Sequence, residues 1–437
     1  MRGTTEHAKE LRRNKQFQWL WIGSAISALG SDISALAFPL LVLAFTGSPA
    51  MAGAVGTVGF ATRLLFALPG GVWGDRWDRR RVLLSCEVIR AISVGTVALA
   101  AIMDRLTIVH IVAAAAILGA AGALFTPARE ATVRVIVKPE LLTVAYAQEH
   151  ARTYGVTLIG PPTSGLLFGW GKAIPFVADA ITYLISATCL MFARIPRRAG
   201  APMVAADAEP TMRADIAEAA RWLWNKPLLR AICLFTLVVN LGSSMLLIPV
   251  IVLVQDRGGS PTVVGIVMGA MGVGGLVGAL VAPRLVGLVP INQLVLAICM
   301  AFAGLVLAIA APFGPYWPAL PMMLAGLLGP VLAIPLQVYI AEQTPAGMMA
   351  RVQSMVEAGF SALLPVGPAL GGFLTEGAGP TRTIVIAAGL IALVLLAGLS
   401  SSTLRRSDVA TAGYPGSPTT AYSPAVDPSA SGEIREG

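Results

Sequence analysis

Charged residues are scarce in this chain of 437 residues. They make up 12% of the total, whereas soluble globular proteins carry about 25%. Hydrophobic residues account for 56% of the chain, and the mean hydropathy is +0.76. This composition excludes an ordinary soluble domain and indicates a membrane protein.

Cysteine and histidine are also rare, with four and three residues respectively. The chain has no Cys-x-x-Cys pair and no grouped Cys/His ligands, so we predict no metal or redox site. The cysteines fall in or beside apolar segments and are interpreted as small buried side chains. Without a Walker loop or a Ser/His/Asp set, the sequence predicts no cofactor, no use of ATP and no enzyme activity.

The net charge of +8 could suggest a nucleic-acid partner. The basic residues are instead dispersed at the ends of apolar segments, where they act as orientation signals in membrane proteins. We therefore expect no nucleic acid and a lipid bilayer as the surrounding medium.

Long apolar segments are what the chain has in abundance. Each segment has at least the 20 or so residues that cross a bilayer as a helix. The predicted spans are 17–46, 50–73, 82–103, 107–128, 143–169, 173–194, 228–254, 261–283, 291–312, 316–341, 351–374 and 379–400. The fold class is therefore all-α, with twelve transmembrane helices in a polytopic membrane protein. The first span is too long for a signal-peptide core and is expected to be retained.

The distribution of Lys and Arg predicts the orientation. If the N-terminus is cytoplasmic, only Arg105, Lys172, Arg257 and Arg382 of the 31 basic residues face outward. Another three, Arg63, Arg90 and Arg152, fall within spans. The remainder face the cytoplasm, so we expect a plasma-membrane protein with both termini inside.

The polar connector 195–227 divides the spans into two groups of six. We predict a cytoplasmic N-terminus over 1–16, bundles over 17–194 and 228–400, and a cytoplasmic linker between them. Residues 214–224 of this linker have the periodicity of an amphipathic helix at the inner membrane surface. The Pro-, Ser- and Thr-rich tail 401–437 is expected to be disordered.

The two halves resemble each other. Pro127 and Pro161 are 34 residues apart in the first half, and Pro335 and Pro368 are 33 apart in the second. This pattern predicts a parallel repeat of two six-helix units. Transporters built from such repeats bind substrate between the units, near the middle of the membrane.

The connector between the second and third spans reads GVWGDRWDRR over residues 71–80. It resembles the G-x-x-x-D-R-x-x-R-R loop of the major facilitator superfamily, and the resemblance covers about residues 15–400. It implies a secondary transporter that works by alternating access. It also implies a conformational latch in this loop, formed by Gly71, Asp75, Arg76, Arg79 and Arg80.

Glycine and proline form two further motifs. Gly155, Gly160, Pro161 and Gly165 in the fifth span resemble the signature of the superfamily's antiporters, although one glycine of that pattern is shifted and one is absent. The intact pattern, Gly367, Pro368, Gly371 and Gly372, lies in the eleventh span. Residues 28–43 and 125–129 resemble the branch of enterobactin exporters, macrolide efflux proteins and Tap-type drug pumps.

Ionisable residues within spans are candidates for function. Asp32 and Arg63 are interpreted either as a static ion pair or as a proton or cation site, in which Arg63 tunes Asp32. Glu149 and Arg152, which share a helix face near Arg129, are interpreted as an ion-pair cluster at the inner mouth, or Glu149 is a proton carrier. Glu357 has the same two interpretations, and Asp179 and Asn240 are candidates to line the cavity.

We predict proton-coupled export of small amphiphilic molecules such as drugs, secondary metabolites or siderophores, by a monomer. The alternatives are a proton-coupled symporter that imports a metabolite, and a membrane sensor that transports nothing.

Overall fold

The computed structural model describes residues 2–195, 221–285, 291–344 and 359–400, with three isolated residues between the last two ranges. Several side chains within these ranges, including those of 68–76, are not described. The predictions for residues 196–220 of the linker and for the tail 401–437 lie outside the described residues.

The described chain is helical throughout. The helices of the first half are α1 (Arg2–Arg13), α2 (Lys15–Thr46), α3 (Pro49–Arg76), α4 (Arg79–Ile102), α5 (Ile108–Ile136), α6 (Leu142–Trp170) and α7 (Ile174–Phe192). Those of the second half are α9 (Pro227–Met245), α10 (Leu247–Asp256), α11 (Pro261–Leu285), α12 (Ile291–Ile309), α13 (Ala319–Gln343), α15 (Val366–Ala378) and α16 (Pro380–Ser400). Seven helical segments of the described chain are long and apolar enough to span a membrane, and three shorter ones are apolar.

Local sequence explains where several helices begin and end. Asn14, Asp78 and Thr107 each accept a backbone N–H at the start of α2, α4 and α5, which satisfies donors that the helix leaves free. Gly47 ends α2 in the left-handed conformation, at φ 68°. The predicted spans therefore agree with the helices to within a few residues in most of the first half.

Two predicted spans of the second half are interrupted. The span predicted at 228–254 consists of α9 and α10, which are separated at Leu246. Pro249 lacks the N–H that would bond to the carbonyl of Met245, so the helix breaks one turn before it. The span predicted at 351–374 contains a turn before Pro365, and α15 begins only at Val366.

The N-terminal segment, predicted as a polar extension, forms a helix that packs on the bundle. Leu11 of α1 is fully buried, and the Nδ2 of Asn14 donates to the carbonyl of Ile136 at 2.8 Å. Lys138 and Glu10 form an exposed ion pair at 2.8 Å. These contacts fix α1 at one end of the first bundle, which we call the α1 end.

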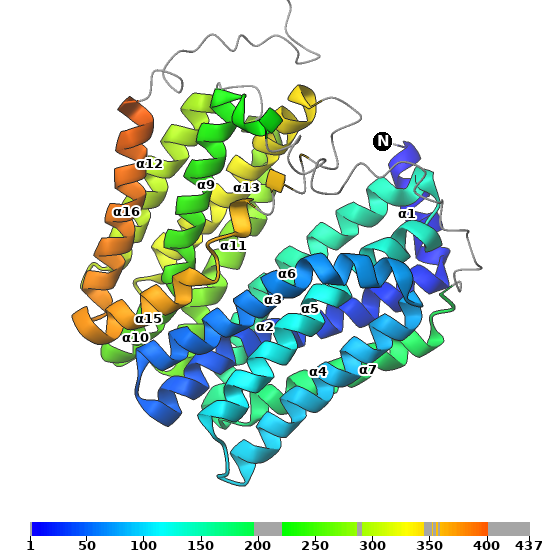
Figure 1. Ribbon diagram of the computed structural model, residues 1–437, viewed down its shortest axis with the longest axis horizontal. Coiled ribbons are helices and arrows are strands. Elements are labelled where there is room, and N and C mark those ends of the chain that lie inside the picture. Colours follow the sequence, from blue (N-terminus) through cyan, green and yellow to red (C-terminus); the bar gives the residue numbers. More distant parts are fainter. Residues whose placement is uncertain are drawn as a thin grey trace, which may run out of the picture.

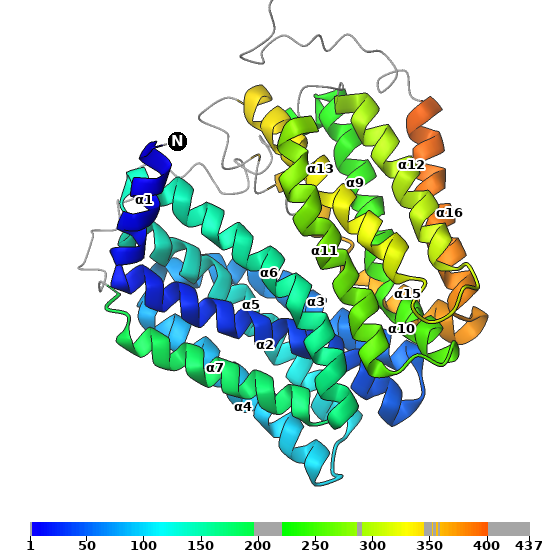
Figure 2. The ribbon, with the colours of Figure 1, turned by 180° about the vertical axis from the view of Figure 1, so that it is seen from behind.

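The helices form two bundles that meet at the end opposite α1 and diverge toward the α1 end (Figure 1). The view from behind shows the same arrangement (Figure 2). The bundles are joined through α3 with α15 and through α6 with α11. Because glycines line both contacts, the helix backbones approach closely there.

Candidate functional site: a neutral cavity and a set of buried charges

A cavity of about 730 Å³ lies in the second bundle, between α9, α11, α12 and α13. Most of its lining is apolar, with Met271, Phe302 and Phe360 as its largest side chains. None of the described residues that line it is charged. A cavity of this size with few polar groups suits a drug-sized amphiphilic ligand.

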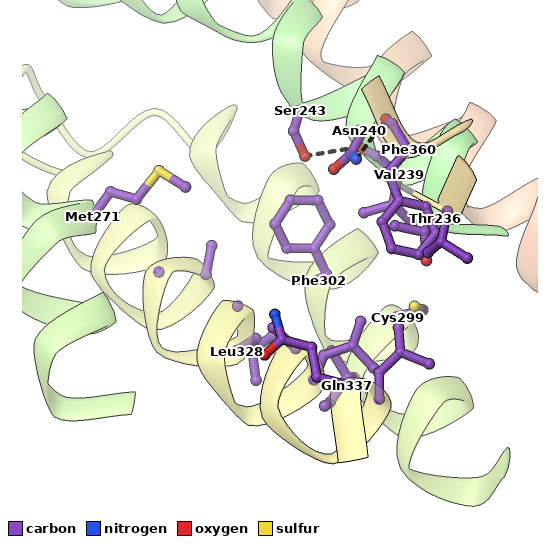
Figure 3. A pocket seen from close by; sticks show the side chains of 18 of the residues that line it. Thr236, Val239, Asn240, Ser243, Met271, Cys299, Phe302, Leu328, Gln337 and Phe360 are labelled. Carbon is purple, nitrogen blue, oxygen red and sulfur yellow. Dashed lines mark hydrogen bonds between the residues drawn. The ribbon is translucent and has the colours of Figure 1, made fainter. Parts of the chain in front are cut away.

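Four uncharged polar side chains interrupt the apolar lining: Thr236, Asn240, Ser243 and Gln337. Figure 3 shows the amide of Gln337 across the cavity from Asn240 and Ser243, with the Phe302 ring between them. Asn240 donates to the carbonyl of Phe360 at 2.9 Å, and Ser243 donates to that of Val239 at 2.8 Å. Asn240 thus lines the cavity and also donates a hydrogen bond to a distant segment of the chain.

The first bundle contains a cluster of two cations and one anion. Glu149 of α6 accepts from Arg129 of α5 and lies 3.0 Å from Arg152, and the three side chains are only 10–12% exposed. Arg152 also donates to the carbonyl of Ser24 on α2 at 2.9 Å. This geometry joins α2, α5 and α6 and matches the ion-pair cluster that the spacing predicts.

Asp32 and Arg63 do not meet. No ion pair or hydrogen bond joins Asp32 to the described side chains, and Arg63 is exposed on α3. Asp32 is half-buried and lies against α6. A Cβ added at Gly160 of α6 would be 2.6 Å from the Cβ of Asp32. The ion-pair interpretation finds no support in this conformation, whereas Asp32 remains a candidate proton carrier.

Asp179 lies elsewhere than the sequence suggested. It has no exposed surface and sits between α7 and α2, where Ser34 and Thr182 donate to its carboxylate. It is therefore a buried member of the first bundle and not part of the cavity lining.

Two buried ionisable residues of α4 were missed as a site by the sequence reasoning. Glu87 is 0% exposed and contacts α2 and α7. Arg90 is 7% exposed and lies over aromatic rings of α5 and α7. Their presence three residues apart in an apolar span is a signal that could have identified them.

The predicted latch is described only in part. The side chains of Gly71, Asp75 and Arg76 lie outside the described residues, as does Glu357. Arg79 and Arg80 donate to the carbonyls of Ala131 at 3.4 Å and Met191 at 2.7 Å. These contacts attach the start of α4 to α5 and α7 at the α1 end.

The two glycine-proline motifs occupy equivalent places in the two halves. A Cβ at Gly160 or Gly367 would meet Asp32 or Ser244 within its own bundle. In contrast, Gly165 and Gly372 face the opposite bundle. Their contacts across the interface are Gly265 and Gly53, whose Cα atoms lie 3.0 Å from the positions of the added Cβ atoms. The backbone oxygens of Pro161 and Pro368 lie close to Gly265 and Gly53. Gly371 packs on the backbone of Met245. Of the glycines in the two motifs, Gly155 alone would have no atom within 4 Å of an added Cβ.

A polar contact between the bundles was not foreseen. At the end opposite α1, Glu376 of α15 accepts from the Oγ of Ser48 and, at 3.0 Å, from the N–H of Ala50 at the start of α3. These hydrogen bonds hold the pKa of Glu376 below its ordinary value, with that from Ser48 the stronger cause. Within the described chain, no group of three or more His, Cys, Asp or Glu could hold a metal ion.

Comparisons with known proteins agree with this geometry. The family described as "Transmembrane secretion effector" matches residues 10–420. The multidrug efflux pump Tap of Mycolicibacterium fortuitum is 29% identical over 375 residues, which cover 82% of this chain and 88% of that protein. Tap of Mycobacterium tuberculosis is 28% identical, over 88% of this chain and 93% of its own. Macrolide efflux protein A of Streptococcus pyogenes is 24% identical over 42% of this chain and 45% of that protein.

Solved structures share the fold at low sequence identity. The nucleoside transporter NupG matches with a TM-score of 0.68 and 15% identity, over 88% of this chain and 98% of that one. An inward-facing, unoccupied bacterial homolog of the human lysosomal transporter Spinster matches with a TM-score of 0.69 and 14% identity. That match covers 90% of this chain and 98% of the homolog.

Proposed function

The chain belongs to the transmembrane secretion effector family of the major facilitator superfamily, and from that premise we propose that it exports small amphiphilic molecules in exchange for protons. It is a multi-pass membrane transporter with two six-helix bundles. Drugs, macrolide-like secondary metabolites and siderophores have the size and amphiphilic character that the proposal requires.

The observation that carries the proposal is the cavity of the second bundle, whose described lining residues are all uncharged. A sugar, nucleotide or phosphate would need several charged or polar partners, and this lining supplies four neutral ones. An amphiphile instead places its apolar surface on Phe302 and Met271, and its polar groups on Asn240 and Gln337. The names of the Tap and macrolide efflux relatives support the same class of cargo.

The energy source that we propose is the proton gradient. Asp32 is the first candidate carrier, because it is half-buried, unpaired among the described side chains and in contact with the glycine-proline motif of α6. Glu149 receives two guanidiniums, which favours a gate at the inner mouth over a carrier. The segment 71–80, which runs from the end of α3 to the start of α4, remains our proposed latch, with Asp75 as its central carboxylate.

The proposed cycle is alternating access by a monomer in the plasma membrane, with both termini in the cytoplasm. On this orientation the α1 end is the cytoplasmic end. The contacts between the bundles described above lie toward the opposite end. In the proposed cycle the bundles are therefore open to the cytoplasm, from which they receive cargo.

Transport in inside-out vesicles tests the proposal. We expect a labelled macrolide or the amphiphile ethidium to accumulate when the vesicle interior is acidified, and to leak out after a protonophore is added. Asp32→Asn and Asp75→Asn should reduce accumulation while the protein still reaches the membrane. Accumulation driven by the opposite gradient would support a symporter, and no movement with or without a gradient would support a sensor.

A further inference from the structure

We propose that Asp179, Glu87 and Arg90 form a second proton-binding site, inside the first bundle and distinct from Asp32, which holds one proton in the conformation described here. As a part of the transport cycle, the site depends on the proposed function. As a proton-binding site, it can be tested without transport.

The geometry brings two carboxylates to one buried region between α2, α4 and α7. Oε1 of Glu87 accepts from Ser186 at 2.8 Å, and Oε2 accepts from Ser27 at 3.2 Å. Oδ2 of Asp179 accepts from Ser34 at 2.5 Å, and Oδ1 accepts from Thr182 at 3.3 Å. Both carboxylates have no exposed surface.

Arg90 is the cation of this region, and its partners are unusual. Its guanidinium carbon lies 4.8 Å from the ring centroid of Phe125 and 5.7 Å from that of Tyr183. No hydrogen bond or ion pair joins Arg90 to a described residue, although its side chain is buried. Because no described acceptor fixes the position of this buried guanidinium, it can approach either carboxylate when that carboxylate becomes charged.

Charge counting gives the proton number. With both carboxylates ionised, the site would hold a net buried charge of −1, and with both protonated, +1. Only one proton on the pair balances Arg90. Because an uncompensated charge at this depth costs several kcal/mol, the singly protonated state is the stable one.

Other charged groups on the neighbouring helices do not change this count. Asp32 of α2 lies against α6, Arg129 of α5 and Arg152 of α6 pair with Glu149, and Cys86 of α4 is a neutral buried thiol. The remaining titratable group at the site is Tyr183, whose hydroxyl is 2.9 Å from Oγ of Ser31.

Hydroxyl groups of α2 contact both carboxylates and the tyrosine between them. Ser27, Ser31 and Ser34 follow one face of α2 at helical spacing and contact Glu87, Tyr183 and Asp179 in that order. They cover about 10 Å of the helix axis, roughly a third of the hydrocarbon thickness. The proton is therefore held by a set of groups that extends part of the way across the membrane.

Infrared difference spectroscopy of the purified full-length protein tests the site directly. In an Asp32→Asn background we expect a carbonyl band of a protonated carboxylic acid at neutral pH. Either Asp179→Asn or Glu87→Gln should abolish this band, because the remaining carboxylate then ionises and balances Arg90. Asp104→Asn, which removes an exposed carboxylate, is the matched control and should leave the band intact. A band that survives both substitutions, or no band before them, overturns the site.

Reconstituted protein tests its role in transport. We expect Asp179→Asn and Glu87→Gln to exchange labelled ethidium for unlabelled ethidium as the wild type does, but to lose at least about tenfold of the accumulation driven by a pH gradient. Equal loss of both activities in a folded variant would indicate a structural role and contradict coupling. If the wild type moves no cargo, the proposed function fails, while the infrared result still decides the proton site.

Discussion

In the part of the chain that the structure describes, the buried charges lie in the first bundle, and the 730 Å³ cavity lies in the second. Four described residues with acidic or basic side chains are buried: Glu87, Arg90, Arg129 and Asp179. All four belong to the first bundle. The buried polar residues of the second bundle are the threonines Thr344, Thr375 and Thr383. The described parts of the two bundles thus differ in the chemistry of their buried residues.

This difference bears on how cargo binding is coupled to proton binding. Charges in a low-dielectric interior interact strongly, so a proton site within the cargo cavity would respond to the charge of each cargo. When the proton site lies in the other bundle, cargo and proton influence each other through the movement of the bundles. A neutral cavity can then accept chemically varied cargo without disturbing the proton site.

The largest expected effect comes from removing the central anion of the first bundle. Glu149→Gln leaves Arg129 and Arg152 buried without their carboxylate, and we expect a loss of about 3–5 kcal/mol in the free energy of unfolding. Thermal unfolding in detergent measures it. Glu130→Gln on the exposed side of α5 is the control and should leave stability unchanged.

A second substitution, Arg152→Gln, should restore part of the stability lost in Glu149→Gln, because it removes one of the unpaired cations. Equal stability of Glu149→Gln and wild type would mean that the cluster contributes nothing to folding.

The next effect concerns the contact between the bundles. A Cβ at Gly265 would lie 2.5 Å from the backbone oxygen of Pro161 and 3.1 Å from the Cα of Gly165. Gly265→Val should therefore disfavour the conformation described here by about 1–3 kcal/mol, which is roughly 5–150-fold in population. Spin labels at Lys172→Cys and Arg382→Cys, at the starts of α7 and α16, should move apart.

Gly304→Val is the matched control, since nothing lies within 4 Å of a Cβ at Gly304. Unchanged spin-label distances in Gly265→Val would show that this contact does not govern which end of the molecule is closed.

A smaller effect tests the neutrality of the cavity. Gln337→Glu places a carboxylate across the cavity from Asn240, with the Phe302 ring between them (Figure 3). We expect the affinity for uncharged cargo to fall about tenfold, equivalent to 1.4 kcal/mol, and the affinity for cationic cargo to rise. Equilibrium binding of an uncharged macrolide derivative and of ethidium measures both changes. Gln337→Met, which keeps the size and adds no charge, should affect both cargoes similarly; the same response from Gln337→Glu would refute a role for charge.

The smallest effect is a pH response at the end opposite α1. The pKa of Glu376 is lowered by its contact with Ser48 and Ala50, so the contact stabilises the closed end above the ordinary pKa of 4.5. That stabilisation is lost as the pH falls through the lowered pKa. We expect the spin-label distance between residues 172 and 382 to increase on acidification, and to be independent of pH in Glu376→Gln. A pH response of equal size in Glu376→Gln would assign the effect to another group.

The order of the spans and the approximate ends of most first-half helices could be predicted from hydropathy, because a bilayer demands long apolar segments. The Glu149 cluster could be predicted because Glu149 and Arg152 share one helix. The partners of Glu87 and Asp179 could not, since they come from α2 and α7, and sequence spacing does not say which helix faces pack together. The break at Leu246 was missed because a proline acts on the residues before it, within a segment that hydropathy reads as continuous.

The coupling between cargo in the second bundle and a proton in the first is tested most directly by measuring proton release when cargo binds. Purified wild-type protein in dilute buffer with a pH indicator would be titrated with ethidium, and binding would be followed in the same sample. We predict that protons appear in proportion to the cargo bound, and that Asp179→Asn binds ethidium but releases fewer protons. Cargo that binds with no proton release at any pH would contradict coupling between cargo and proton.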